Sequence, residues 1–268
     1  MNQLPGVRDD AAAGWASLLG ELDRWEKAER IATLWWRDDD AVVPNPSLYR
    51  LVAIAKEIPI ALAVIPADAR PDLAIWLSQS RPSLAVLQHG WRHSNHSADQ
   101  KKSEFPFARS ADEVSFDLSS GRVRLVQLFG RRALPVLVPP WNRFDHGFLP
   151  LLGDCGIRAI SRLKPRRTLS PRPGVIEVNV HVDLVAWAGD RGFIGEEAAL
   201  DGIIGHLRAR RLGTVCRDEP TGILTHHLVQ DDATDAFLRQ IIAVTRAHPA
   251  ARWLDATEVF AAARANPA

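Results

Sequence analysis

Short apolar runs rich in β-branched residues alternate with segments of helical spacing along most of this 268-residue chain. Such alternation predicts parallel strands joined by helices that cover the outside of the sheet. No Gly/Ser-rich linker or internal repeat breaks the pattern, so we expect one domain over residues 1–268, with its strands closed into a barrel. The predicted strands are Ile31–Arg37, Ile58–Ile65, Leu84–Gln88, Leu134–Val138, Ile157–Ser161, Val175–Val182 and Gly222–Thr225. The predicted helices are Ala11–Glu29, Pro46–Glu57, Pro71–Ser78, Ala111–Phe129, Gly147–Cys155, Glu196–Arg211, Ala233–His248 and Ala256–Arg264.

Charge balance and cysteine content argue against several classes of protein. Lysine and arginine total 33 against 32 aspartate and glutamate, which leaves no overall field to attract a nucleic acid. Cys155 and Cys216 are too few for a disulfide framework and lack zinc-ribbon spacing, so we expect two packed thiols. No apolar run reaches the about 18 residues of a membrane span, and residues 1–30 do not resemble a signal peptide. We therefore expect a cytoplasmic protein whose partner is a small-molecule or carbohydrate substrate.

Residues able to bind metal follow several predicted strands, at the end where barrels of this kind place their chemistry. The run Asp38–Asp40 follows the first strand; on its own it is more typical of a solvated acidic turn. His89 and His93 are four residues apart, so a helical turn would put both imidazoles on one face, a common spacing for divalent-metal ligands. We expect six of the nine histidines to gather at one end of the barrel: His89, His93, His96, His181, His226 and His227.

Imidazole and carboxylate together suit a borderline transition ion such as zinc. Two histidines and one carboxylate leave coordination positions open for water and substrate, as a hydrolytic centre needs. The joint occurrence of these groups at successive strand ends therefore predicts a hydrolytic metal centre.

In order and content, these segments resemble the NodB-homology polysaccharide deacetylases, carbohydrate esterase family four, over roughly Thr33 to Phe260. The resemblance implies a distorted (β/α)7 barrel of the polysaccharide deacetylase type, with its motif-bearing core at about residues 31–260. The family motif T-F-D-D-G is similar to Arg37–Ala41, which makes Asp39 the counterpart of the catalytic base and Asp40 that of the metal-binding aspartate. Strand alternation places Asp38 and Asp40 on one side and Asp39 on the other, so Asp38 is a rival for these roles.

The second motif, H-[ST]-x-x-H, is matched by His89–His93, with Gly90 where the family usually has a hydroxyl residue. By resemblance, Asp40, His89 and His93 hold the metal. Asn95 and His96 extend the motif as partners that orient a ligating imidazole or as alternative ligands.

The third motif, R-x-P-Y-G, is similar to residues 138–142, and Trp141 replaces the tyrosine whose backbone N–H stabilises the oxyanion. Val138 replaces the arginine that usually pairs with the base, so this partner is missing unless Arg37 or Arg143 supplies it from another direction. In the fourth motif, V-D-x-x-D-W, Ala186 replaces the aspartate that supports that arginine. The two losses are mutually consistent.

The fifth motif, L-x-H, is matched by Leu224-Thr225-His226, which makes His226 similar to the general acid. The resemblance thus implies a hydrolase of carbon–nitrogen bonds that removes an N-acetyl or N-acyl group from an amino sugar or other carbohydrate. Its cofactor is a divalent ion, zinc first, with cobalt, nickel, iron and manganese as alternatives. The expected substrate contacts are Trp91, Pro140, Asn142, Arg143, Asp183, Trp187 and His227.

Two other functions are compatible with the same sequence. One is a non-catalytic metal- and carbohydrate-binding protein that lost activity together with the arginine–aspartate pair. The other is an amidase that acts on a substrate other than a sugar.

Overall fold

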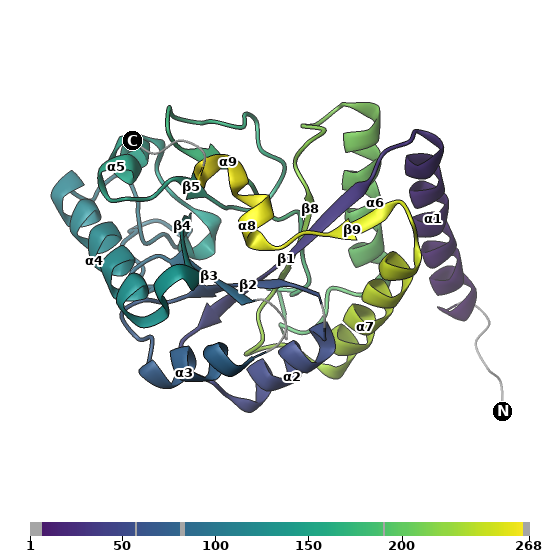
Figure 1. Cartoon of the computed structure of the whole chain (residues 1–268), viewed down its shortest axis with the longest axis horizontal. Coiled ribbons are helices and arrows are strands. Elements are labelled where there is room, and N and C mark those ends of the chain that lie inside the picture. Colours follow the sequence, from purple (N-terminus) through teal and green to yellow (C-terminus); the bar gives the residue numbers. More distant parts are fainter. Residues whose placement is uncertain (1–6, 57, 81–83, 190, 265–268) are drawn as a thin grey trace.

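The computed structural model describes residues 7–56, 58–80, 84–189 and 191–264. These residues form one sheet of nine parallel strands in the order β6-β5-β4-β3-β2-β1-β8-β7, with β9 paired to β1 (Figure 1). The strands are β1 (Ala32–Ala41), β2 (Ile60–Val64), β3 (Leu84–His89), β4 (Ala133–Val138), β5 (Ala159–Ile160), β6 (Ile176–Glu177), β7 (Val182–Asp183), β8 (Thr221–Thr225) and β9 (Ala251–Trp253).

Helices α1 to α7 surround the sheet on its outer side, whereas α8 and α9 lie across the barrel, where Phe260 packs against the interior Trp35 (Figure 1). They are α1 (Val7–Lys27), α2 (Pro46–Ala55), α3 (Pro71–Gln79), α4 (Ala111–Phe129), α5 (Leu149–Asp154), α6 (Glu196–Leu212), α7 (Asp232–Ala247), α8 (Ala256–Val259) and α9 (Ala261–Arg264). Three short 3₁₀ turns are η1 (Gly130–Arg132), η2 (Pro140–Asn142) and η3 (His146–Phe148). No helix within the described ranges combines the length and the apolar character that a membrane crossing requires.

One bent segment closes the sheet into a barrel. In residues 176–183, β6 pairs with β5 and β7 pairs with β8, so the segment joins the two ends of the strand order. The backbone N–H of Val178 donates to Ile160 O at 3.1 Å, and that of His181 donates to Gly222 O at 2.7 Å. The predicted distorted barrel is confirmed. The strand expected over 175–182 is divided into β6 and β7 because its pairing partner changes half-way.

Side-chain alternation on the strands separates two buried layers. Trp35, with alanine, valine and leucine residues of neighbouring strands, fills the barrel interior, and its indole N–H donates to Asn179 O at 3.1 Å. Trp36 points the other way, into the layer between sheet and helices. The two faces of β1 therefore have different surroundings, which decides where the acidic residues at its end are directed.

Several predicted elements differ from the structure in their bounds, and one strand was not predicted. The first strand does not end at Arg37 but runs through the three aspartates to Ala41, because the buried carboxylates have polar partners and need not leave the sheet. The last helix is divided at Phe260, and β9 was not predicted. The helix expected to end at Glu57 is described to Ala55, and position 57 lies outside the described residues.

Candidate metal centre and active site

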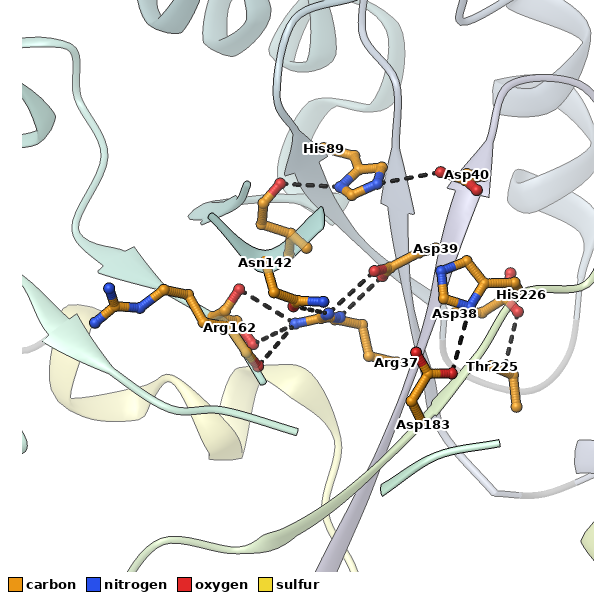
Figure 2. Close-up of polar contacts among 12 residues, drawn as sticks. Arg37, Asp38, Asp39, Asp40, His89, Asn142, Arg162, Asp183, Thr225 and His226 are labelled. Carbon is orange, nitrogen blue, oxygen red and sulfur yellow. Dashed lines mark hydrogen bonds and ion pairs between the residues drawn. The ribbon is translucent and has the colours of Figure 1, made fainter. Parts of the chain in front are cut away.

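Asp40, His89 and His93 come together at the carboxyl ends of β1 and β3. Asp40 Oδ1 lies 3.1 Å from His89 Nε2 (Figure 2) and 3.4 Å from His93 Nε2. One ligand atom from each residue lies within 4.8 Å of the other two. Asp40 Oδ1 is buried and has no partner in hydrogen-bond geometry among the described residues. A buried oxygen that faces two imidazole nitrogens is the arrangement expected of ligands around a cation.

The protonation of His89 supports this interpretation. Its Nδ1 lies 2.9 Å from the carbonyl oxygen of Val138, which can only accept, so Nδ1 carries the proton. In the neutral ring the lone pair of Nε2 then points toward Asp40. Burial lowers the pKa of His89, but the charges of Asp39 and Asp40 outweigh it and raise that pKa, so without a cation two carboxylates draw a proton to this ring. Burial lowers the pKa of His93, as does the nearby His89, so His93 favours its neutral form. Burial raises the pKa of Asp40, but contact with His89 and the nearby imidazoles outweigh it and keep that pKa well below the usual value.

A β-bulge decides which aspartate meets the histidines. The pairing between β1 and β2 shifts register between Asp38 and Ala41, and Asp40 has φ 73°. Without the bulge, Asp40 would share a face with Asp38; with it, the side chain turns toward His89. Left-handed backbone also occurs at His93, Trp141 and Asn142, so four of the eight described non-glycine residues with positive φ lie at this site.

Asp38 instead forms a buried link between β1 and β8. Its Oδ1 accepts from the Thr225 hydroxyl at 2.7 Å and from the His227 N–H at 3.0 Å, and its Oδ2 lies 2.6 Å from His227 Nδ1. Burial lowers the pKa of His227, but the Asp38 charge outweighs it and raises that pKa. Neither Asp38 nor His227 lines the cavity that is lined by Asp40, His89 and His93.

Asp39 lies on the other face of β1, paired with a buried arginine from the same strand. Arg37 Nε donates to Asp39 Oδ1 at 2.8 Å and Arg37 Nη2 to Oδ2 at 3.0 Å (Figure 2). The guanidinium also donates to the Ser161 hydroxyl at 2.8 Å and to Asn142 Oδ1 at 2.9 Å. Arg37 is therefore the guanidinium next to Asp39, whereas Arg143 donates to the Lys102 carbonyl.

His226 follows β8 and lies against Asp183 and Trp187. Its Nδ1 is 3.8 Å from Asp183 Oδ1 and is buried with no hydrogen-bond partner within the described residues. The Trp187 indole N–H donates to Asp183 Oδ2 at 2.7 Å, and its ring lies edge-on to His226. Burial raises the pKa of Asp183 despite the nearby His226.

A cavity of about 910 Å³ connects these groups. Among the predicted site residues, those that line it are Asp39, Asp40, His89, His93, Trp141, Asn142, Arg143, Asp183, Trp187 and His226. Trp91, Pro140 and His227 are not among the lining residues, and Asn95 and His96 lie on an exposed loop. His181 lies beside the start of β8, so the expectation that six histidines gather at one end is wrong.

Glu104 and Gly90 shape the histidine loop, and sequence reasoning missed Glu104. The fully buried Glu104 carboxylate accepts from the N–H groups of Trp91 at 3.2 Å and Arg92 at 2.8 Å. Gly90 has φ 60°, and a Cβ there would collide with Glu104 Oε2 and approach Pro140 to 2.8 Å. The loop is therefore not the helical turn that the His89–His93 spacing suggested. In the sequence, Glu104 is marked only as an acidic residue directly before Phe105.

No protein-family model matches the chain, and no curated protein matches it. A protein from Mycobacterium smegmatis assigned to the polysaccharide deacetylases has 18% identity and a TM-score of 0.59, covering 88% of this chain and 91% of its own. A family 4 acetyl xylan esterase from Clostridium thermocellum with a cobalt ion has 16% identity and a TM-score of 0.52, covering 88% and 93%. The chain has the fold of these enzymes.

A third similar structure is a mutant of a pseudoenzyme of carbohydrate esterase family 4 whose activity was restored. It has 14% identity and a TM-score of 0.52, covering 85% of this chain and 67% of its own. The same barrel thus occurs in catalysts and in a chain that had lost catalysis, so function must be argued from the site.

Proposed function

We propose that this protein is a metal-dependent hydrolase that removes an N-acetyl or other N-acyl group from an amino sugar or other carbohydrate. The observation that carries the proposal is one cavity with two carboxylates in different surroundings. Asp40 faces His89 and His93, whereas Asp39 is held by Arg37. One carboxylate suits metal ligation and the other suits proton transfer.

Asp40, His89 and His93 would hold the divalent ion. When bound, such an ion polarises the acyl carbonyl and lowers the pKa of a coordinated water. Two imidazoles and one carboxylate favour zinc, and the cobalt in the Clostridium thermocellum esterase accords with an ion of this group.

Asp39 takes the proton from the attacking water, because both of its oxygens are fixed by Arg37 and it lines the same cavity. His226 gives a proton to the departing nitrogen, with Asp183 and Trp187 fixing its ring. The backbone N–H of Trp141 stabilises the developing oxyanion. The Trp141 and Trp187 rings, both on the cavity wall, offer apolar faces to a sugar ring or an acyl group.

The non-catalytic alternative has its basis in Val138 and Ala186, which replace the family's arginine and aspartate. The bidentate Arg37–Asp39 contact argues for the enzyme, since a guanidinium still contacts the predicted base. In the amidase alternative, the same residues would hydrolyse an amide whose amine is not part of a sugar.

Asp39→Asn tests the proposal. With zinc or cobalt added, the wild type should release acetate from N-acetylated amino sugars, and the variant should lose about 10²- to 10⁴-fold in kcat, the usual contribution of a general base. Metal content should stay at the wild-type level, because Asp39 is not one of the three proposed ligands Asp40, His89 and His93. Acyl release from non-sugar amides alone would support the amidase. No release from amino sugars or from non-sugar amides would support the binding protein.

A further inference from the structure

A second cavity of about 450 Å³ adjoins the catalytic one and shares Asn142 and Leu163 with it. We call it the basic annex, because Arg162, Arg166 and Arg167 line it. Figure 2 shows the Arg162 side chain directed away from Arg37 and Asp39. A substrate whose acyl amine lies at the histidines has room to extend past Asn142 into this annex.

The one carboxylate lining the annex is already engaged. Glu177 Oε1 accepts from Arg162 Nε at 2.9 Å and Nη2 at 2.7 Å, and from Asn179 Nδ2 at 3.0 Å. Glu177 therefore compensates Arg162 and leaves two arginines in the annex.

Those two arginines have no carboxylate partner for their guanidinium groups within the described residues. Arg166 is 7% exposed; its Nη1 donates to Glu177 O at 2.8 Å and its Nη2 to Cys216 Sγ at 3.1 Å. Its Nε is buried and has no hydrogen-bond partner there. Arg167 is exposed. Two guanidinium groups without a carboxylate partner, one of them exposed, leave positive charge in the annex that an anion can compensate.

Further cations line the mouth of the catalytic cavity: Lys101, Lys102, Arg143 and Arg191. Three carboxylates, Asp39, Asp40 and Asp183, line the same cavity, so the clearer excess of positive charge lies in the annex, where three arginines stand against one glutamate. A cleft with an excess of one sign of charge attracts and orients ligands of the opposite sign.

We infer that the substrate carries an anionic substituent, a carboxylate or a phosphate, which the basic annex binds while the acyl amine lies at Asp40, His89 and His93. This inference rests on the proposed function and specifies its substrate class. Guanidinium groups present paired donors that match both kinds of oxyanion.

The experiment compares kcat/KM for acyl release from N-acetylglucosamine, N-acetylmuramic acid and N-acetylglucosamine 6-phosphate. The wild type should favour an anionic member by about tenfold or more, the ratio that one charge-assisted hydrogen bond supplies. A preference for N-acetylmuramic acid would indicate a carboxylate site, and a preference for N-acetylglucosamine 6-phosphate would indicate a phosphate site. Arg167→Gln should lower kcat/KM for the favoured anionic sugar about tenfold more than for the neutral sugar, whereas Arg239→Gln, in an exposed arginine of α7, should keep the wild-type preference. Equal wild-type values for all three sugars, or an equal loss on all three in Arg167→Gln, would overturn the inference.

Binding of the deacetylated products separates this inference from the proposed function. Glucosamine 6-phosphate or muramic acid should bind the metal-loaded wild type more tightly than glucosamine does, and Arg167→Gln should abolish the difference. If no substrate is hydrolysed but this binding pattern appears, the anion site in the annex is supported and the enzyme proposal is contradicted. If hydrolysis occurs without any charge preference, the anion site is contradicted and the enzyme proposal is supported.

Discussion

Among the described residues, the barrel contains two clusters of two histidines and one carboxylate, and they differ in hydrogen bonding more than in composition. The first is Asp40, His89 and His93 at the carboxyl ends of the strands. The second is His181, His206 and Glu219, buried near the start of β8. Residue type alone would assign a metal to both.

The backbone partner of one ring nitrogen separates them. In the second cluster, His181 Nδ1 accepts the N–H of Gly222 at 2.9 Å, so a neutral ring must carry its proton on Nε2. That nitrogen lies 3.5 Å from Glu219 Oε2, beyond hydrogen-bond geometry, and in the neutral ring it faces the carboxylate with an N–H and not with a lone pair. In the first cluster, His89 Nδ1 faces a carbonyl, and its Nε2 lone pair is free. The hydrogen bond made by the other ring nitrogen therefore decides whether a histidine can ligate.

The largest predicted effect tests this difference directly. The wild type, dialysed after zinc loading, should retain one tightly held ion per chain, and His89→Ala should lose it completely. His206→Ala is the matched variant from the second cluster and should retain the ion in the folded fraction, as measured by elemental analysis. An ion lost in His206→Ala and kept in His89→Ala would reverse the assignment of the two clusters.

Each cluster also has a buried arginine nearby, which gives the second prediction. Arg37 holds Asp39, whereas Arg210 donates to Thr33 O at 2.8 Å and to the Thr221 hydroxyl at 3.1 Å. Arg37→Met should lower kcat by about 10- to 100-fold, because a charge-assisted bidentate contact that positions the base is lost. KM and metal content should stay near the wild-type values.

Arg210→Met is the control for Arg37→Met. It should lower the free energy of unfolding by about 1–3 kcal/mol, because buried acceptors lose their donor, yet keep kcat per folded molecule. Equal kcat losses in the two variants would mean that Arg37 acts only through stability. Added guanidinium should partly restore activity to Arg37→Ala but not to a variant of Arg210.

The third prediction concerns the loop that directs His93. Gly90→Ala should lower the free energy of unfolding by about 2–4 kcal/mol, because left-handed backbone and a collision with Glu104 act together. Gly130 has φ 54°, and a Cβ at this position would have no neighbouring atom within 4 Å, so Gly130→Ala should cost only about 1 kcal/mol. Chemical denaturation measures both. Metal affinity should fall in Gly90→Ala alone, and equal behaviour of the two variants would show that Glu104 does not constrain the loop.

Much of the barrel and the candidate ligands could be predicted because they depend on short-range signals. Hydrophobic alternation indicated the strands, and the spacing of His89 and His93 after an apolar run indicated ligands at a strand end. The rest depended on contacts between distant segments. Nothing near Asp40 in the sequence announces the bulge that turns it toward the histidines, so Asp38 remained a rival until the pairing register was known.

Glu104 and His181 show the same limit. Glu104 acts on backbone N–H groups of a loop more than ten residues away, and those groups carry no sequence signature. His181 lies next to a strand and was grouped with the site histidines, but its strand is bent, and its ring is fixed by Gly222 at the other end of the barrel.

The last prediction concerns the pH dependence of stability that arises from the second cluster. Burial, together with the nearby His181 and Arg210, lowers the pKa of His206 to about 2. An unfolded histidine titrates near 6.5, so below that pH the unfolded chain binds a proton that the folded chain refuses, and stability falls as pH falls. The slope approaches about 1.4 kcal/mol per pH unit between pH 6 and 4. In chelator, His206→Asn should flatten the slope of unfolding free energy against pH, whereas His96→Asn, on an exposed loop, should keep it. An unchanged slope in His206→Asn would mean that His206 of the wild type takes up its proton within the folded chain.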